Sequence, residues 1–295
     1  MRIAAHMLGY GVDRFLADCV ATMLPHIDKL FIGYSKKPFL YNGAARQTET
    51  NPTPRTAFSD LSAGDRLEII DGDWATEEEA RNTCLEAARR QGFDWLLVVD
   101  ADEFYSAQSW EQLRQILGTS ISYDHIITTW YNFYKSSHYV LVERDGGIKS
   151  TNAAFAVRCA GSVRFRDRRL PTAARLRILD CPCHHYGYVM SDAEMLTKIN
   201  TWSHAADFDR MRWYDLKWRN WTITTRNLHP VSPTIWRKAT RFPLPQPEFA
   251  HKYAIEVPEA PPRRLGMRIR DAAYDLKAEG LVIARDVKAA LRPFR

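Results

Sequence analysis

Apolar runs and helix-period patterns alternate along the N-terminal third of the chain. Short apolar runs predict four strands, at 2–8, 29–35, 66–74 and 94–100. Apolar residues at helical spacing predict a helix over 12–25. Thr76 and Glu79 have the spacing of a capping box, which predicts a second helix that runs to about Gln91. Because the run "LLVV" is continuous rather than alternating, it is typical of a strand covered on both faces. The pattern predicts an α/β fold with a mostly parallel sheet flanked by helices.

The rest of the chain does not show this regular alternation of strand and helix patterns. Residues 36–65 are polar and rich in Pro, Asn and Thr, which predicts a long loop. Two aromatic strands are expected within 124–146. Helical patterns follow at four places, 109–118, 192–205, 209–221 and the amphipathic tail 269–294. Five prolines between Pro230 and Pro247 predict an irregular crossing segment. We expect a division into three parts, 1–105, 106–229 and 230–295.

Three carboxylates, Asp100, Asp102 and Glu103, follow the apolar strand at 94–100. In open α/β sheets, ligands bind beyond the carboxyl ends of the strands. Two aspartates at positions i and i+2 converge on one divalent cation if the backbone turns there, and hard oxygen ligands suit Mg²⁺ or Mn²⁺. The alternative is that Asp100 caps the next helix while Asp102 and Glu103 are solvated. The buried strand and the parallel-sheet context favour the metal interpretation.

The segment "EEEARNTCLEAARRQGFDWLLVVDADEF" resembles the core signature of GT-A-fold glycosyltransferases, especially the family 2-like group. In that group an Ala-Arg-Asn at a helix start precedes an apolar strand that ends in D-x-D. The opening "MRIAAHMLGYGVDRFLADCVATMLPHIDKLFIGYS" is similar to the first strand, helix and second strand of the same group. The resemblance covers about residues 1–105. It implies a GT-A-type fold in which 1–105 is the nucleotide-sugar-binding half and 106–229 the acceptor-side half.

The resemblance also implies roles for individual residues. Asp102 would bind a Mn²⁺ or Mg²⁺ ion directly, and Asp100 would contact the ribose or bind the metal through water. Asp71 would lie where the family holds the nucleobase or ribose. Arg81 would lie close to the D-x-D and the phosphates. The alternative for Arg81 is a surface residue paired with a glutamate one helical turn earlier.

A further metal ligand in this fold often comes from well downstream. The segment "CPCHH" offers His184 and His185, and imidazole is acceptable to Mn²⁺. We expect His184 slightly more than His185, and the alternative is that both are satisfied by local hydrogen bonds. A structural zinc site is disfavoured because Cys181 and Cys183 have a C-x-C spacing and the chain has no second cysteine pair.

An inverting transfer needs a general base near the acceptor hydroxyl. Asp192 and Glu194 are the first candidates, and Glu103 is a third. The alternative is that Ser191 caps the helix at 192 and that the two carboxylates favour the helix dipole.

Two further groups of side chains have a functional and a structural interpretation. The aromatic residues at 130–139 and 202–221 suit either an acceptor groove, through stacking on sugar rings, or core packing, which is the commoner case. Six arginines within 162–177 suit contacts with phosphates or an acidic acceptor, but a solvated arginine-rich loop is the commoner explanation.

The net charge of the 295-residue chain is +6, and most of the excess lies at the C-terminus. From Arg263 onward there are nine Lys or Arg against four Asp or Glu, a balance of +5. A uniformly basic surface is therefore not indicated, and we expect no nucleic-acid partner. The amphipathic tail could lie on an anionic membrane surface, cover the sheet or pack on a partner.

Five cysteines without regular spacing do not predict a disulfide framework and favour a reducing compartment. The N-terminus has no signal-peptide pattern and no window approaches the length of a membrane span. We expect a cytoplasmic protein, with peripheral membrane contact as an open alternative.

The function best supported by the sequence is a metal-dependent glycosyltransferase that moves a sugar from a nucleotide-diphosphate donor to a glycan, lipid or other hydroxyl acceptor. One alternative is an inactive nucleotide- or glycan-binding protein of the same fold. Another is a Mg²⁺-dependent phosphoryl-transfer enzyme with an aspartate nucleophile. That class places its D-x-D after the first strand and has Thr or Val soon after it, whereas Glu103 and Phe104 follow here.

Overall fold

The computed structural model describes residues 1–39, 50–119, 122–150, 154–173, 175–201, 206–255, 257 and 263–290. The chain forms two compact units. Unit 1 contains Met1–Tyr131 and Ser150–His185, and unit 2 contains Asn132–Lys149 and Tyr186–Arg295. This division differs from the three predicted parts, because the chain passes from one unit to the other more than once.

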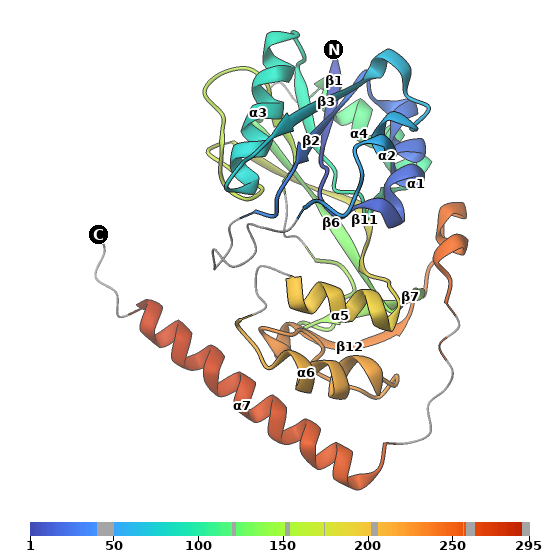
Figure 1. Cartoon of the computed structure of the whole chain (residues 1–295), viewed down its shortest axis with the longest axis vertical. Helices are drawn as coiled ribbons and strands as arrows, with labels where there is room; N and C mark the ends of the chain where they lie inside the picture. The colour runs from blue at the N-terminus through green and yellow to red at the C-terminus, as the bar shows by residue number, and fades with distance from the viewer. Residues whose placement is uncertain are drawn as a thin grey trace. The chain divides into compact units, whose positions relative to one another are not determined.

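The centre of unit 1 is a parallel sheet with the strand order β4-β1-β2-β3, and Figure 1 labels β1, β2 and β3. The four strands are β1 (Ile3–Leu8), β2 (Lys29–Ser35), β3 (Leu67–Gly72) and β4 (Trp95–Val98). Every residue of β4 is buried, as its continuous apolar sequence predicts. The antiparallel strands β8 (Ala154–Arg158) and β6 (His125–Tyr134) continue the sheet beyond β4. The predicted α/β fold with a parallel sheet is confirmed.

Helices cover this sheet, and their ends follow from the sequence. The helical elements of unit 1 are α1 (Asp13–Met23), η1 (Leu24–His26), α2 (Thr56–Ser59), η3 (Gly64–Arg66), α3 (Glu77–Arg90) and α4 (Ala107–Thr119). At the start of α3 the Thr76 hydroxyl accepts a hydrogen bond from Glu79 N at 3.4 Å. The Glu79 carboxylate accepts one from Ala75 N at 2.8 Å, one residue before the expected capping-box donor. The predicted helix over 76–91 is confirmed.

A short hairpin and a strand pair complete unit 1. The hairpin consists of β9 (Phe165–Asp167) and β10 (Leu170–Pro171), and Arg168 in its turn has φ 47°. Asn82 on α3 holds it in the manner of a neighbouring strand: its amide donates to Phe165 O at 2.8 Å and accepts from Phe165 N at 2.9 Å. The strand pair is β5 (Glu103–Tyr105) with β11 (Leu176–Tyr188), antiparallel.

Unit 2 is built on β7 (Ser136–Glu143) and β12 (Trp236–Arg241), which pair antiparallel. The expectation of an irregular segment between Pro230 and Pro247 is therefore wrong for β12. This strand contains no proline, so it can pair along β7. The helical elements are α5 (Asp192–Thr201), α6 (Arg210–Trp213), the π-helical η4 (Tyr214–Arg219), η5 (Pro233–Ile235), η6 (Glu248–Tyr253) and α7 (Leu265–Ala290).

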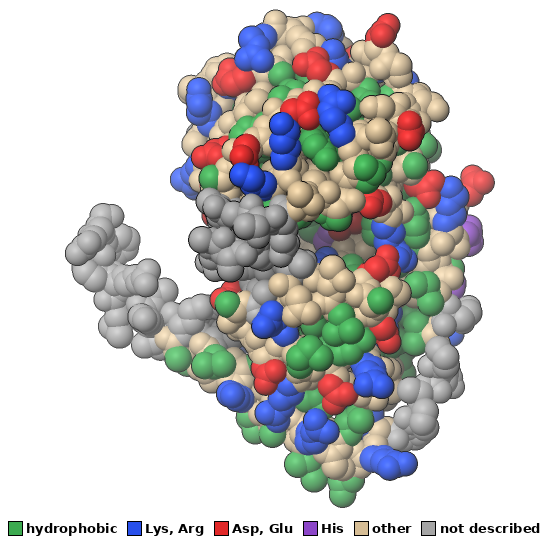
Figure 2. Space-filling view, viewed as in Figure 1, with side chains coloured by type: hydrophobic (Ala, Val, Ile, Leu, Met, Phe, Trp, Pro, Cys, Tyr) green, Lys and Arg blue, Asp and Glu red, His purple; other side chains and the backbone are tan. Residues whose placement is uncertain are grey.

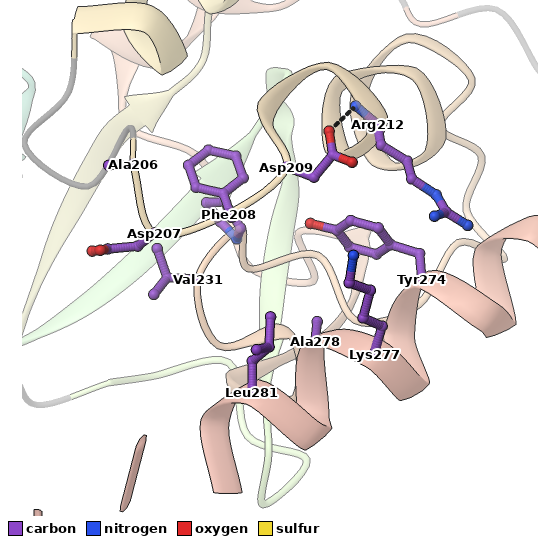
Figure 3. A pocket seen from close by; sticks show the side chains of 11 residues that line it. Ala206, Asp207, Phe208, Asp209, Arg212, Val231, Tyr274, Lys277, Ala278 and Leu281 are labelled. Atoms are coloured by element: carbon purple, nitrogen blue, oxygen red, sulfur yellow. Dashed lines mark hydrogen bonds between the residues drawn. The ribbon is translucent and has the colours of Figure 1, made fainter. Parts of the chain in front are cut away.

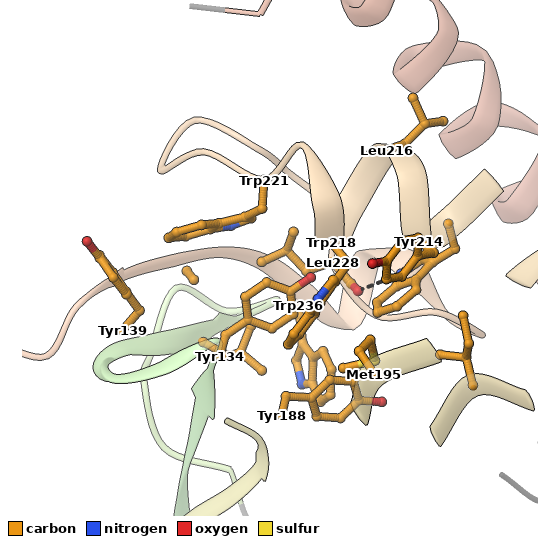
Figure 4. Close-up of a cluster of buried hydrophobic side chains, with 14 of the residues drawn as sticks. Tyr134, Tyr139, Tyr188, Met195, Tyr214, Leu216, Trp218, Trp221, Leu228 and Trp236 are labelled. Atoms are coloured by element: carbon orange, nitrogen blue, oxygen red, sulfur yellow. Dashed lines mark hydrogen bonds between the residues drawn. The ribbon is translucent and has the colours of Figure 1, made fainter. Parts of the chain in front are cut away.

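Aromatic side chains form the core of unit 2 (Figure 4). Trp213, Trp218 and Trp221 are buried, and the Trp213 indole donates to Leu228 O at 3.0 Å. Tyr134 packs edge-on against Trp218 with ring centroids 5.1 Å apart. The aromatic residues of 209–221 thus pack in the core, which is the structural alternative for this segment.

Buried ion pairs attach the C-terminal helix α7 to the rest of unit 2. Lys217, which is 0% exposed, has Nζ 2.6 Å from Asp271 Oδ1 and 2.6 Å from Asp275 Oδ1. Arg263 lies 2.6 Å from the other oxygen of Asp271. The predicted helical C-terminal extension is confirmed. Within the described part of the chain, no helix, α7 included, combines the length and the apolar character that crossing a membrane requires.

Candidate functional site

The D-x-D motif lies in a turn between β4 and β5, at the carboxyl end of the parallel sheet. Asp100 N donates to the Glu103 carboxylate at 3.3 Å, and Glu103 N donates to Asp100 O at 3.0 Å. These two hydrogen bonds close the turn. The side chains of Asp100 and Asp102 remain partly exposed, at 31% and 27%. The prediction that the acidic cluster follows the end of a buried strand is confirmed.

Two arginines hold the carboxylate of Asp100. Arg81 Nη2 lies 3.3 Å from both carboxylate oxygens, and Arg169 Nη1 lies 3.2 Å from Oδ2. Partial burial works against the charge of Asp100, but Arg81 and Arg169 outweigh it and hold the pKa of this carboxyl well below its usual range. Asp100 is therefore ionised at any physiological pH, and its charge is matched by protein.

Arg81 is 1% exposed and has three kinds of neighbour. Besides Asp100 it contacts Glu77 at 3.4 Å, so the helical pairing that was the alternative interpretation is present as well. Its Nη1 lies 3.4 Å from His6 Nε2 on β1. Burial lowers the pKa of His6, and the charge of Arg81 lowers it further, so the ring is neutral. The expected position of Arg81 beside the D-x-D is confirmed.

Arg169 is the residue of this site that sequence patterns did not single out. It pairs with Glu103 through Nη1 and Nη2, and its Nη2 donates to Val98 O and Ala154 O, each at 2.9 Å. Burial opposes the charge of Arg169, but Glu103 and Asp100 outweigh it and raise the pKa of the guanidinium. Arg169 is one of six arginines within 162–177, and it shares the turn of the β9–β10 hairpin with Arg168.

Glu103 is a buried partner of Arg169, with 1% of its side chain exposed. Burial raises the pKa of its carboxyl, and Arg169 limits the rise. A general base must reach the proton that it removes. Because Glu103 is enclosed and paired, this geometry supports a structural role for it and not the predicted role as a base.

His184 and His185 lie on opposite faces of β11, because side chains alternate along a strand. His185 is opposite Glu103 in the β5–β11 register, and its Nε2 lies 3.6 Å from Asp102 Oδ2. His184 is opposite Phe104 and is buried beside the ring of Tyr131, with centroids 5.5 Å apart. Burial lowers the pKa of His184 to about 4. The geometry thus favours His185 over His184 as a ligand beside Asp102, the reverse of the expected order.

Asp102 and His185 beside the D-x-D turn fit a cation whose other ligands are substrate phosphates. Nowhere in the described residues do three or more His, Cys, Asp or Glu side chains form a group that could hold a metal ion. Asp102 and His185 supply one carboxylate and one imidazole, while Asp100 is engaged by Arg81 and Arg169. Mg²⁺ is commonly bound by one or two carboxylates together with substrate phosphates. The residues therefore fit a shared cation better than one enclosed by protein alone.

Asp71 lies near the end of β3 and binds Arg55 in a forked ion pair at 3.0–3.2 Å. Nearby, Asn51 ties the ends of β1 and β2 together: its amide donates to Ser35 O at 2.8 Å and accepts from Gly11 N at 3.2 Å. The same edge of the sheet thus carries Asp71 and the segment around Asn51, which these hydrogen bonds hold in place. Residues 40–49 of the predicted long loop lie outside the described residues.

Asp192 and Glu194 open α5 in unit 2. The Glu194 carboxylate accepts from Ser191 N at 2.7 Å and Ser191 Oγ accepts from Glu194 N at 3.3 Å, which is a capping box. Asp192 accepts from the indole of Trp218 at 2.8 Å and lies 3.4 Å from Lys135 Nζ. The structural interpretation accounts for Glu194. Asp192 is 58% exposed, so its carboxylate remains accessible, and its role as a base stays a prediction.

A separate cavity of about 360 Å³ lies in unit 2 between α7 and residues 206–212 (Figure 3). Its lining includes Phe208, Arg212 and Tyr274. None of the predicted site residues contributes to it.

Comparisons with known proteins show only distant structural likeness. No family model and no curated protein sequence matches the chain. Among solved structures, S. aureus TarS matches with a TM-score of 0.38 and 11% identity over 75% of this chain and 43% of that one. The chain therefore spans less than half the length of TarS. The 4-diphosphocytidyl-2C-methyl-D-erythritol synthase of Anaerococcus prevotii matches with a TM-score of 0.35 and 12% identity, over 64% of this chain and 89% of that one. At these scores the likeness carries no argument about activity.

Proposed function

We propose that the chain is a divalent-cation-dependent glycosyltransferase that transfers a sugar from a nucleotide-diphosphate donor to a hydroxyl group of an acceptor. The observation that carries this proposal is the pair Asp102 and His185 at the carboxyl end of β4, beside an Asp100 whose charge is already matched. A glycan or lipid-linked acceptor is part of the proposal, as is the GT-A-like arrangement predicted from the sequence.

The residues of the site divide into a support made by ion pairs and a partly exposed pair. Arg81, Arg169 and Glu103 fix the turn, because each makes an ion pair within it. Arg81 and Glu103 are buried, and the side chain of Arg169 is 13% exposed. Asp102 and His185 remain partly exposed, at 27% and 20%. A Mn²⁺ or Mg²⁺ ion held by this pair would neutralise the charge that develops on the leaving diphosphate.

Other residues would bind and orient the donor. Asp100 is permanently ionised and can accept a hydrogen bond from a ribose hydroxyl. Asp71 and Arg55, on the same edge of the sheet, offer an acceptor and a donor to the nucleobase or ribose. In unit 2, Asp192 is the accessible carboxylate proposed as the general base for the acceptor.

The phosphoryl-transfer alternative is weaker on chemical grounds. An aspartate nucleophile attacks through a carboxylate oxygen, and its reactivity falls as its basicity falls. The first aspartate of the motif, Asp100, has both oxygens engaged by arginine. These ion pairs lower its basicity and oppose the formation of an acyl phosphate.

The test is a thermal-shift panel of UDP, GDP, CDP, dTDP and ADP, each with and without Mn²⁺ or Mg²⁺. A ligand at a hundred times its dissociation constant adds about 2.7 kcal/mol of stability. We expect one diphosphate to stabilise the protein only when metal is present. Asp102→Ala should abolish this shift, whereas Glu111→Ala, which removes an exposed carboxylate from α4, should retain it.

Turnover is then measured as release of that diphosphate from its sugar conjugate. A metal-dependent shift without turnover on any acceptor would support the inactive binding protein instead. The absence of a shift with all five diphosphates, or an undiminished shift in Asp102→Ala, would contradict the proposal.

A further inference from the structure

The helix α7 buries Tyr274 and two paired aspartates on its inner face, and it leaves large aliphatic residues on its outer face. Its inner face carries Asp271 and Asp275, which pair with the buried Lys217. The most exposed large hydrophobic residues of unit 2 include Leu276, at 73%, and Leu265, at 70%. In a helix that only packs against its own domain, the apolar face is the one that is buried.

The exposed aliphatic residues form one stripe. Leu265, Ile269, Leu276 and Ile283 are all at least 61% exposed. Their spacings of four, seven and seven residues place them within about 40° of one another around a helix with 3.6 residues per turn. Leu281, in contrast, points to the cavity beside Ala278 and Tyr274 (Figure 3). The stripe therefore runs along most of α7 and is distinct from the lining of that cavity.

The charges that remain on the outer side of α7 are mostly basic. Asp271 and Asp275 are turned inward and paired, so they do not offset the exposed arginines. Arg264 and Arg268 are exposed, each directly before a residue of the stripe in the sequence, whereas Lys277 lines the cavity. Figure 2 shows hydrophobic and basic side chains together at the surface along the edge where α7 runs. An apolar stripe flanked by basic residues is the pattern of a helix that lies in a lipid interface.

We infer that the outer face of α7 binds an anionic lipid surface. The helix lies parallel to the surface, with the four aliphatic side chains in the boundary between headgroups and acyl chains, and with Arg264 and Arg268 at the phosphates. The balance of nine basic to four acidic residues from Arg263 to the end of the chain matches the sign of such a surface. This binding is independent of the proposed sugar transfer.

A second copy of the chain fits this stripe less well. Pairing of two helices requires two apolar rows, at the a and d positions of a heptad. The row Ile269, Leu276 and Ile283 is aliphatic throughout, but the row beside it reads Leu265, Ala272 and Glu279. The small residue and the acidic residue in that row oppose a helix–helix seam, whereas a flat lipid surface needs only one broad stripe.

The experiment is co-sedimentation of the full chain with vesicles. One set consists of phosphatidylcholine alone, and the other of equal parts phosphatidylcholine and phosphatidylglycerol. We expect the protein to bind the second set, with a partition coefficient that falls as salt is raised. The double variant Ile269→Ser and Leu276→Ser should lower the coefficient by at least about tenfold, because each exposed aliphatic side chain would otherwise be buried in the interface.

The matched control is Met211→Ser, which removes an exposed hydrophobic residue from α6 that is not part of the stripe. It should bind as the unchanged protein does, and thermal unfolding should show that both variants fold. Failure of the protein to bind the anionic vesicles would overturn the inference, as would equal binding by the double variant. A third result would also overturn it: light scattering shows that the unchanged protein is a dimer and the double variant a monomer, and neither protein binds vesicles.

Discussion

Arg169 and Glu103, with side chains 13% and 1% exposed, form an ion pair although 66 residues separate them along the chain. The guanidinium also contacts Asp100, so a single side chain from the β9–β10 hairpin holds both ends of the D-x-D turn. Removing one partner of a buried pair leaves the other charge uncompensated, which costs about 3–5 kcal/mol.

We therefore expect Arg169→Ala to lower the free energy of unfolding by about 3–5 kcal/mol, measured by urea denaturation. Arg164→Ala is the control, since Arg164 comes from the same segment but is 64% exposed. Its cost should be within about 0.5 kcal/mol. A loss below about 1 kcal/mol for Arg169→Ala would mean that water compensates the charge of Glu103 when the guanidinium is removed.

The two adjacent histidines should separate ligand binding from stability. His185→Ala should remove the metal-dependent thermal shift produced by the active nucleoside diphosphate while the unliganded protein keeps its melting temperature, since His185 lies beside Asp102. His184→Ala should retain the shift but destabilise the protein by about 2 kcal/mol or more, because it leaves a cavity next to Tyr131. The opposite result would restore His184 as the ligand.

Glu143, at the end of β7, gives a prediction about pH. Burial raises the pKa of its carboxyl from 4.5 to about 7, so the folded state favours the protonated form. This contribution to stability is complete below pH 4.5 and is lost as the pH rises to about 7. Since Glu143 is only half-buried, we expect a loss of about 1–2 kcal/mol over this range.

Glu143→Gln isolates this effect, because glutamine keeps the shape and cannot ionise. The difference in unfolding free energy between the two proteins, measured from pH 4 to pH 8, should change in favour of the variant as the pH rises. A difference that stays constant over that range would show that Glu143 is solvated.

Lys217 anchors α7 through Asp271 and Asp275, so Lys217→Met should release the helix. Loss of the ion pairs should lower the free energy of opening α7 by about 3 kcal/mol. We therefore expect thermolysin to cleave within 265–290 at least about tenfold faster. Lys238→Ala, which changes an exposed lysine of β12, should leave the cleavage rate unchanged. Equal protection of α7 in both variants would contradict the anchoring role.

Much of unit 1 could be predicted because its signals are local. The strand at 94–100 is a continuous apolar run, and the start of α3 is fixed by Thr76 and Glu79, three residues apart. The nearness of Arg81 to Asp100 was expected from a known motif rather than from periodicity. β12 was not predicted, since the prolines on either side of it obscured a strand of six residues.

The rest of the site depends on contacts between distant segments. Nothing near Arg169 distinguishes it from Arg164 or Arg166, and only the hairpin turn brings it to Glu103. The choice between His184 and His185 depends on the register of β11 against β5, and a shift of one residue would exchange their roles.

The hydrogen bonds of Asn82 to Phe165 have a consequence for synthesis of the chain on the ribosome. Arg81 meets Asp100 across only 19 residues, so this pair can form early. Glu103 can pair only after Arg169 has been synthesised. The hydrogen bonds of Asn82 to Phe165 hold the β9–β10 hairpin that carries Arg169. At 5–20 residues per second, the 66 residues from Glu103 to Arg169 take roughly 3–13 seconds to synthesise, and Glu103 lacks this ion pair during that time. Adjacent residues of one helix, Arg81 and Asn82, thus contact one segment that is synthesised early and one that is synthesised late.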